Sequence, residues 1–444
     1  MKSVLHTGLL PAAVLIRKLR DGVFDGRLRQ FYGDAAELSG YRDRIAAAVG
    51  QFCELYGDRP LCVFSVSGRT ELGGNHTDHQ NGRVLAGGIS ADILAAAAPA
   101  DDAVMRVCSE GYPPDAVSCS DLTVHTAEAG TSAALLRGVA AAFAGRGIRT
   151  GGFYALLTSD VLKGSGLSSS AAYEVLTGCI LNRFYARDLL TPTELAMAAQ
   201  HAETVYFGKP CGLMDQMACA LGGAAAMDFA DPAHPVCERL TLDPEANGYA
   251  LCIIETGADH AGLTDEYAAI PAEMGAIAAV LGARVLRETD EACFWEKLPE
   301  IRRQCGDRAV LRAIHFYREN ERVLRQTAAL KRGDFAGFLR LVQESGQSSA
   351  LYLQNLTVTG GTRNQAVAFA LALTGRLLAG QGAGRVHGGG FAGTVQAYVP
   401  LSRLSDFRTE TERLLGEGIC HVLRIRSIGA SALWDCEGEE TICC

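Results

Sequence analysis

A short glycine- and serine-rich segment, KGSGLSSSAAYEV at Lys163–Val175, constrains the fold of this chain more than any other feature. It predicts a glycine loop that runs directly into the N-terminus of an alanine-rich helix. The first N–H groups of a helix have no partner inside it, and the helix dipole makes that end electropositive, so this turn suits phosphate. Ser168, Ser169 and Ser170 would add hydroxyl donors, or one of them a ligand for Mg²⁺. A serine-capped helix after a flexible turn is the alternative, and this segment alone does not separate the two.

The segments around the loop predict the strand, loop and helix order that a phosphate site requires. Gly151–Val161 is typical of a strand and leads straight into the loop. Ser132–Gly147 predicts a helix that stops at glycine, and a further helix is expected from the Thr191–Pro192 start to Gly208. This setting favours the phosphate interpretation over the capped helix.

The length of the chain, 444 residues, exceeds the size at which a single core stops growing, so two domains are expected. Mixed helix and strand patterns on both sides of a proline-containing turn near Asp231 and Pro235 predict two α+β lobes. We place the domains at residues 1–230 and 231–444. Further predicted elements are a helix at Leu38–Tyr56, strands at Leu61–Gly68, Arg83–Pro99, Val104–Glu110, Gly222–Ala230 and Tyr249–Gly257, and a largely helical stretch at Leu263–Leu330.

Composition excludes several functions. The formal charge of −9 and the scattered Lys and Arg residues give no basic surface for nucleic acid. The apolar run from Val4 to Ile16 is interrupted by His6 and Pro11, so we expect an amphipathic helix that packs on the body or contacts another copy, and no signal peptide. No stretch is apolar enough to cross a membrane. A monomer or weak homo-oligomer is expected.

Cysteine usage predicts a cytoplasmic protein. The chain has 15 cysteines and no C-x-x-C pair, and most of the thiols lie in apolar runs, which is typical of reduced core residues. The tail residues Cys436, Cys443 and Cys444 are the exception, and weak redox or metal contact there stays open.

A loop dense in polar groups follows the predicted strand at Leu61–Gly68. So many donors and acceptors in the 16 residues from Ser67 to Gly82 suit a polyhydroxylated ligand, because each sugar hydroxyl both donates and accepts. An ordinary polar turn is the alternative. The polar residues of the loop are Arg69, Glu71, Asn75, His76, Asp78 and His79.

Two later segments add carboxylates and glycines. Ala202–Ala218 carries Glu203 late in a predicted helix and Asp215 past a Gly-Lys-Pro-Cys-Gly break, which suits one carboxylate to a metal and the other to a proton. Asp215 lies between two methionines, where a surface carboxylate would be unusual. Gly382–Thr394 is a glycine run whose backbone can approach a ligand closely.

These four segments, in this order, resemble the galactokinases of the GHMP small-molecule kinase superfamily over about residues 61–399. The polar loop resembles P-G-R-x-N-x-I-G-E-H-T-D-Y, and the phosphate loop resembles G-x-G-L-S-S-S-A-A. The third segment is similar to A-E-x-x-x-x-G-x-P-C-G-I-M-D-Q, and the fourth to G-G-G-F-G-G. The resemblance implies a two-domain α+β fold with the active site in the cleft between an N-terminal lobe and a C-terminal lobe.

The resemblance also implies transfer of the γ-phosphoryl group of Mg·ATP to the anomeric hydroxyl of a sugar, with ATP and Mg²⁺ as cofactors and no partner beyond these small molecules. Asp215 matches the catalytic aspartate and Arg69 the arginine beside it. Ser170 and Glu203 match metal ligands, and no lysine is assigned to the phosphates. The implied sugar contacts are Glu71, Asn75, His76, Asp78 and Tyr267, and the implied phosphate-loop residues are Gly164, Ser165, Gly166, Leu167, Ser168, Ser169 and Ser170.

The chain departs from the family pattern at several points. Glu71 and Asn75 stand where the family has Asn and Glu, an apparent exchange, and an amide at position 75 can donate as well as accept. His79 replaces a tyrosine and His387 a threonine. His387 is either a neutral substitution or a new phosphate or sugar donor. Residues 350–360 depart from the segment that the family has there.

Three functions remain open at this point: a galactose kinase, a kinase for another aldose such as N-acetylgalactosamine, arabinose or a modified hexose, and a galactose and ATP sensor without turnover. The intact set of Arg69, Asp215, Glu203 and serines favours an enzyme. The change at Asn75 bears on which sugar is bound.

Overall fold

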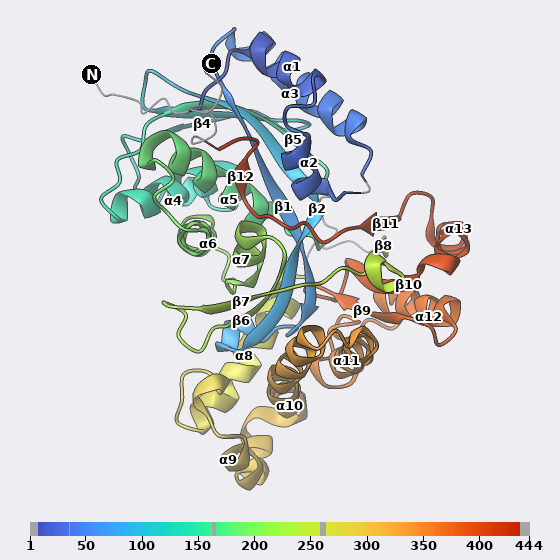
Figure 1. Cartoon of the computed structure of the whole chain (residues 1–444). Helices are drawn as coiled ribbons and strands as arrows, with labels where there is room; N and C mark the ends of the chain where they lie inside the picture. The colour runs from blue at the N-terminus through green and yellow to red at the C-terminus, as the bar shows by residue number, and fades with distance from the viewer. Residues whose placement is uncertain (1–7, 35, 162–165, 258–262, 436–444) are drawn as a thin grey trace.

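The computed structural model describes residues 8–34, 36–161, 166–257 and 263–435 and contains two β-sheets with helices packed on them (Figure 1). Gly164 and Ser165 of the phosphate loop lie outside these residues, as do Cys436, Cys443 and Cys444. The first sheet has the strand order β12-β1-β2-β5-β3-β4, and β6 pairs with both β2 and β7. Its strands are β1 (Cys62–Gly73), β2 (Arg83–Pro99), β3 (Val104–Ser109), β4 (Asp115–Ser118), β5 (Phe153–Ser159), β6 (Ala224–Asp228), β7 (Val236–Leu240) and β12 (Ser431–Ala432).

Both faces of this sheet are covered, which is why its central strands are apolar almost throughout. Side chains alternate between faces along a strand, so Phe64 and Val66 pack against one helical layer while Val63 packs against the other. One layer consists of α4 (Ser132–Gly145), α5 (Ser169–Leu181), α6 (Pro192–His201) and α7 (Met214–Leu221), and the opposite layer of α1 (Ala12–Arg20), α2 (Asp25–Tyr32) and α3 (Leu38–Tyr56).

The predicted amphipathic helix near the N-terminus is confirmed as α1, which buries Leu15 and Leu19 against the body. The helix predicted at Leu38–Tyr56 is α3, with the same bounds. Arg83–Pro99 forms one long strand, as expected. In the part of the chain that the structure describes, no helix has the length and apolarity needed to cross a bilayer.

The second sheet has the strand order β11-β8-β10-β9 and packs against α12 and α13. Its elements are β8 (Tyr249–Glu255), β9 (Ala383–His387), β10 (Thr394–Pro400), β11 (Cys420–Leu423), α12 (Ala366–Leu378) and α13 (Leu404–Leu415). The predicted helical stretch at Leu263–Leu330 becomes α8 (Thr264–Val280), α9 (Glu291–Glu296) and α10 (Leu298–Lys331), and α11 (Phe335–Ser348) follows it.

Short helical turns complete the chain. They are η1 (Asp78–Gln80), η2 (Thr126–Glu128), η3 (Asn182–Ala186), η4 (Ala202–Phe207), η5 (Glu245–Asn247), η6 (Leu286–Glu288), η7 (Ser349–Leu353) and η8 (Leu401–Arg403). Three of them, η3, η4 and η7, are π-turns that end the helices α5, α6 and α11. Turns of this kind are frequent at functional sites.

The first sheet takes strands from both sides of the boundary placed at residue 230. Both β7 and β12 follow that residue in sequence, yet β7 pairs with β6 and β12 pairs with β1. The C-terminal segment therefore returns to the first lobe. The division into residues 1–230 and 231–444 stays a prediction.

Candidate active site

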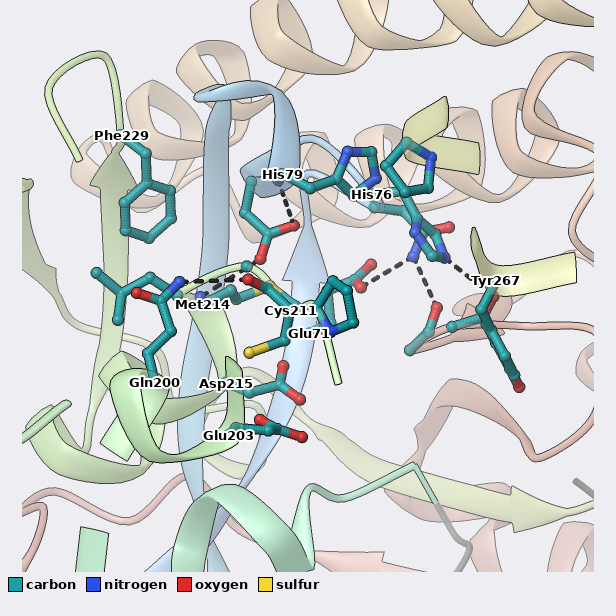
Figure 2. Close-up of a pocket in the computed structure, with 18 of the residues that line it drawn as sticks. Glu71, His76, His79, Gln200, Glu203, Cys211, Met214, Asp215, Phe229 and Tyr267 are labelled. Carbon is teal, nitrogen blue, oxygen red and sulfur yellow. Dashed lines mark hydrogen bonds between the residues drawn. The ribbon is translucent and has the colours of Figure 1, made fainter. Parts of the chain in front are cut away.

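A cavity of about 520 Å³ is lined by residues from both sides of the predicted boundary at residue 230, and it collects most of the residues that the sequence singles out. Its wall comes from the end of β1 and the turn after it, the turn between η4 and α7, the start of α8, and the glycine turn after β9. The prediction that Arg69 and Glu71 lie in a loop is wrong, because β1 runs on to Gly73 and carries both. Figure 2 shows Asp215 and Glu203 on one side of this space and Tyr267 on another. Three of the four sequence segments thus line one cavity. The described residues of the phosphate loop do not line it but are bonded to Arg69 and Asp215 in its wall.

Arg69 and Asp215 form a bidentate ion pair at the centre of the site. Arg69 Nε donates to Asp215 Oδ1 and Arg69 Nη2 to Asp215 Oδ2, each at 2.7 Å. Arg69 lies on β1 between two register shifts, which turn its side chain out of the regular alternation. Asp215 lies in the first turn of α7, where the helix dipole favours a negative charge.

The electrostatics keep Asp215 ionised. Burial raises the pKa of this carboxyl group, but attraction and hydrogen bonds from Arg69 outweigh burial and hold the pKa below its usual value. Arg69 is 5% exposed, whereas the Asp215 side chain is 34% exposed and faces the cavity. The carboxylate is thus charged, fixed in orientation and open on one side.

The phosphate loop is tied to this pair. The backbone N–H of Arg69 donates to the carbonyl oxygen of Leu167 at 3.0 Å, and its guanidinium donates to the carbonyl oxygen of Gly166. Ser168 has a positive φ and donates its hydroxyl to Asp215. The helix α5 begins at Ser169, and Ser168 at its N-cap makes no side-chain capping hydrogen bond. Within the described residues the serine-capped helix is therefore not formed, and phosphate binding at this helix N-terminus stays a prediction.

Asp78 is held deep in the cavity wall by backbone groups. Its carboxylate accepts from the N–H groups of His79, at 3.0 Å, and Met214, at 3.4 Å. Burial, and next the charge of Asp215, raise the pKa of Asp78 to about 6. A Cβ atom on Gly212 would overlap this carboxylate, so glycine is required there.

The glycine turn at 388–390 forms another part of the wall. The His76 ring nitrogen Nε2 is 3.0 Å from the carbonyl oxygen of Gly389, and the Tyr267 hydroxyl donates to that of Gly390 at 2.9 Å. Burial is the main cause that lowers the pKa of His76, so its imidazole is neutral at pH 7. Both side chains line the cavity, and their role as sugar contacts stays a prediction.

Glu203 lies at the end of the cavity near Asp215. Its carboxylate accepts from Lys209 Nζ at 3.0 Å and from Gln216 Nε2 at 2.7 Å. Gln216 also donates to Glu174 at 3.2 Å, and burial, followed by the charge of Glu203, raises the pKa of Glu174 well above its usual value. Two carboxylates thus share one amide donor beside the Arg69–Asp215 pair.

The residues predicted to hold Mg²⁺ offer hard oxygen ligands of the kind this ion prefers, a hydroxyl from Ser170 in the first turn of α5 and a carboxylate from Glu203. The buried Glu174 Oε1 has no hydrogen-bond partner in the part of the chain that the structure describes. Among the described residues no cluster of three or more His, Cys, Asp or Glu side chains is placed to hold a metal. The donor set fits an ion that keeps most of its ligands from phosphate and water.

Glu71 and Asn75 lie under the cavity with side chains that are 1% and 0% exposed. They bond to each other, with Asn75 Nδ2 2.9 Å from Glu71 Oε2. Glu71 also pairs with Arg385 of β9. The apparent exchange of residue types therefore falls on two residues in direct contact.

His387 is enclosed behind the wall. Its Nε2 accepts from the backbone N–H of Glu71 at 3.2 Å, so the proton is on Nδ1, which is 3.0 Å from Thr394 Oγ1. Burial, with the charges of Arg69 and Arg385, lowers the pKa of this imidazole well below its usual value. A neutral, 1% exposed ring supports the interpretation as a structural substitution over a phosphate donor.

Lys209 and Gln200 are among the cavity residues that sequence reasoning missed. Lys209 lies in the Gly-Lys-Pro-Cys-Gly break, and its ammonium group interacts with Glu203 and, at longer range, lowers the pKa of Asp215. A lysine six residues after a predicted metal-binding glutamate is the signal that would have found it. His79 lines the cavity, and neither of its ring nitrogens has a hydrogen-bond partner among the described residues.

Comparison with known proteins gives matches along most of the chain. Residues 132–223 match the GHMP kinases N terminal domain, and residues 50–99 match the galactokinase galactose-binding signature. A galactokinase from Streptomyces coelicolor is 34% identical over 297 residues, which cover 66% of this chain and 75% of the relative. A galactokinase from Chloroflexus aggregans is 30% identical over 375 residues, covering 82% and 90%.

Solved structures agree on the fold. The crystal structure of Lactococcus lactis galactokinase complexed with galactose aligns with a TM-score of 0.74 at 23% identity, covering 87% of this chain and 99% of that one. A mevalonate kinase aligns with a TM-score of 0.57 at 12% identity, covering 82% and 98%. The predicted α+β GHMP kinase fold is confirmed. With the matched relatives, this shows that the chain belongs to the galactokinase family of the GHMP kinases and is an ATP-dependent sugar kinase.

Proposed function

We propose that this protein transfers the γ-phosphoryl group of ATP to the anomeric hydroxyl of galactose. The observation that carries the proposal is the Asp215–Arg69 pair, a charged carboxylate that is fixed by two hydrogen bonds and open to the cavity. The galactokinase relatives support galactose as the sugar.

In the proposed reaction Asp215 orients the attacking hydroxyl and accepts its proton. A carboxylate with a lowered pKa is a weak base, so proton transfer follows as the bond to phosphorus forms rather than preceding it. Arg69 keeps the carboxylate ionised and places positive charge beside the phosphoryl group. Lys209 adds a second positive charge on the same side of the cavity.

The remaining assignments follow the same geometry. His76, Asp78 and Tyr267 would contact sugar hydroxyls, since all three line the cavity. Residues 164–170 and the N-terminus of α5 would hold the phosphates. When Mg²⁺ is bound, it would neutralise phosphate charge, held by Ser170 and Glu203. A cytoplasmic location belongs to the same proposal and is supported by the free thiols of the described cysteines.

The test is an assay of ADP release with a panel of aldoses, namely galactose, N-acetylgalactosamine and arabinose. The proposal expects the highest kcat/KM on galactose. Turnover on another aldose with none on galactose would favour the second candidate, a kinase for a different sugar, which the altered residues Glu71, Asn75 and His79 bring into consideration. Binding of galactose and ATP without turnover would favour a sensor.

A further inference from the structure

Every hydrogen-bonding position of the Asn75 side chain is already used by the protein. Its Nδ2 donates to Glu71 Oε2 at 2.9 Å and to the carbonyl oxygen of Gly388 at 2.8 Å. Its Oδ1 accepts from Asn355 Nδ2 at 2.9 Å and from Ser349 Oγ at 3.2 Å. An amide side chain has two N–H donors and two acceptor lone pairs. The enclosed Asn75 side chain therefore has no position left for a sugar hydroxyl.

The order of the two exchanged residues fits these contacts. Glu71 only accepts, and its two oxygens face the guanidinium of Arg385 and the amide of Asn75. Asn75 must donate to the carbonyl oxygen of Gly388, which a carboxylate at that position would be unable to do. Placing the negative charge at Glu71 also pairs it with the fully buried Arg385. The arrangement leaves neither the charge nor the amide unsatisfied.

The hydrogen bond from the Asn75 amide to Gly388 holds the glycine turn at 388–390 in place. Asn355 donates to the carbonyl oxygen of Gly389 at 3.2 Å as well as to Asn75, so the turn and the side chain are joined twice. A Cβ on Gly388 would lie 3.6 Å from the carbonyl oxygen of Gly166, which places the turn directly against the phosphate loop. The position of this turn therefore affects both the sugar side and the phosphate side of the cavity.

We propose that Asn75, supported by Glu71, is a positioning residue that fixes the glycine turn at 388–390 against the phosphate loop, and that it does not contact the sugar. This changes the role that resemblance implies for Asn75. The sugar is then recognised by those cavity-lining side chains that are partly exposed to the cavity. The part of the proposal that concerns sugars rests on the proposed function, and the part that concerns the phosphate loop does not.

The first experiment measures Mg·ADP binding by calorimetry without any sugar. In Asn75→Asp the donors to Glu71 and Gly388 are lost, so the turn is released and we expect affinity for Mg·ADP to fall about fivefold to tenfold. The matched control is Asn182→Asp, a buried asparagine that bonds both backbone groups of Leu190 away from the cavity. We expect it to lower stability without changing the affinity. Unchanged Mg·ADP affinity in Asn75→Asp would overturn the proposal.

The second experiment crosses the variant with a set of sugars, namely galactose, 2-deoxygalactose, 6-deoxygalactose and arabinose. A positioning residue lowers kcat/KM by the same factor for each sugar that the wild type phosphorylates. A residue that reads one hydroxyl loses its effect on the sugar that lacks this hydroxyl, and that result would overturn the proposal. If the wild type phosphorylates none of these sugars, the proposed function fails while the calorimetric result still stands.

A milder variant keeps the test usable if Asn75→Asp does not fold. Ser349→Ala removes one of the two donors to Asn75 Oδ1 and leaves the cavity lining intact. We expect about a twofold loss of Mg·ADP affinity and an equal factor for every sugar. Wild-type affinity combined with a loss confined to one sugar would contradict the positioning role.

Discussion

Two carboxylates, Asp215 and Asp92, are paired with buried arginines in this molecule, and the comparison separates function from architecture. Asp92 accepts from Tyr32 at 2.8 Å and Arg44 at 2.6 Å, and it also contacts Ser65 and Arg426. Its side chain is 0% exposed. Within the described part of the chain Asp215 has two partners, Arg69 and Ser168, and its side chain is 34% exposed toward the cavity.

Both carboxylates are paired with arginine, and they differ in whether one side of the carboxylate is exposed to a cavity. The groups around Asp92 come from α2, α3, β1 and the C-terminal segment, so this cluster joins the N-terminal helices to the first sheet. Asp215 leaves room for a reacting hydroxyl. By this criterion Glu71, which borders the cavity but is enclosed by Arg385 and Asn75, belongs with Asp92.

The largest effect should come from Asp215→Ala. Loss of the group that orients the hydroxyl and accepts its proton is expected to lower kcat by about a thousandfold or more. The variant should stay folded and bind Mg·ADP, because Arg69 keeps its bond to the phosphate loop. Initial rates of ADP release, thermal unfolding and calorimetry check this. Near-full activity would show that the mechanism is wrong.

The reverse pattern is expected for Asp92→Ala. Removing this carboxylate leaves the fully buried guanidinium of Arg426 without its charge partner, which should lower the free energy of unfolding by about 3–5 kcal/mol. Values of kcat and KM for the folded protein should not change. Urea unfolding measures the loss, and Asp102→Ala, at an ion pair that is half exposed, is the control with an expected loss below about 1 kcal/mol. A large drop in kcat would remove the distinction between the two clusters.

The cavity side of the comparison can be disturbed without changing any charge, through Gly212→Ala. The added methyl group would overlap the carboxylate of Asp78 and displace it, so we expect KM for the sugar to rise about tenfold with little change in kcat. Gly275→Ala is the matched control, because nothing lies within 4 Å of its Cβ position. Steady-state kinetics with varied sugar measure both. An unchanged KM would mean that Asp78 does not bind sugar.

Much of this arrangement could be predicted from local pattern. The apolar periodicity of residues 38–56 defines α3 because a helix depends on neighbours three and four residues apart. The return of β12 to β1 could not be predicted, since it pairs residues far apart in sequence and only two residues form the strand. The pairing of the C-terminal strand β12 with β1 is therefore a property of the tertiary fold.

The site shows the same division. The pairing of Arg69 with Asp215, 146 residues apart, was predicted only through family resemblance. The positioning role that we propose for Asn75 was not predicted. Of its partners, Asn355 lies in the segment at residues 350–360 where the resemblance fails, and Ser349 lies directly before that segment. When the partners of a side chain lie in a segment that departs from the family pattern, the motif that contains the side chain does not reveal those contacts.

The smallest expected effect is a pH dependence of kcat/KM that comes from Asp78 and not from Asp215. Asp78, with a pKa of about 6, is expected to lose the charged form that accepts from sugar hydroxyls, so kcat/KM should halve near pH 6 and fall about tenfold by pH 5. Asp215 should stay ionised there, because Arg69 lowers its pKa.

Stability should move the opposite way to activity. Burial raises the folded pKa of Asp78 above its unfolded value, so the folded state binds more protons between about pH 4 and pH 6, and this group alone makes the protein more stable as the pH falls through that window. Asp78→Asn should abolish both the acid limb of the kcat/KM profile and this stabilisation, measured by urea unfolding at pH 5 and 7. An acid limb that persists in Asp78→Asn would have to come from another group. A different carboxylate would then accept hydrogen bonds from the sugar.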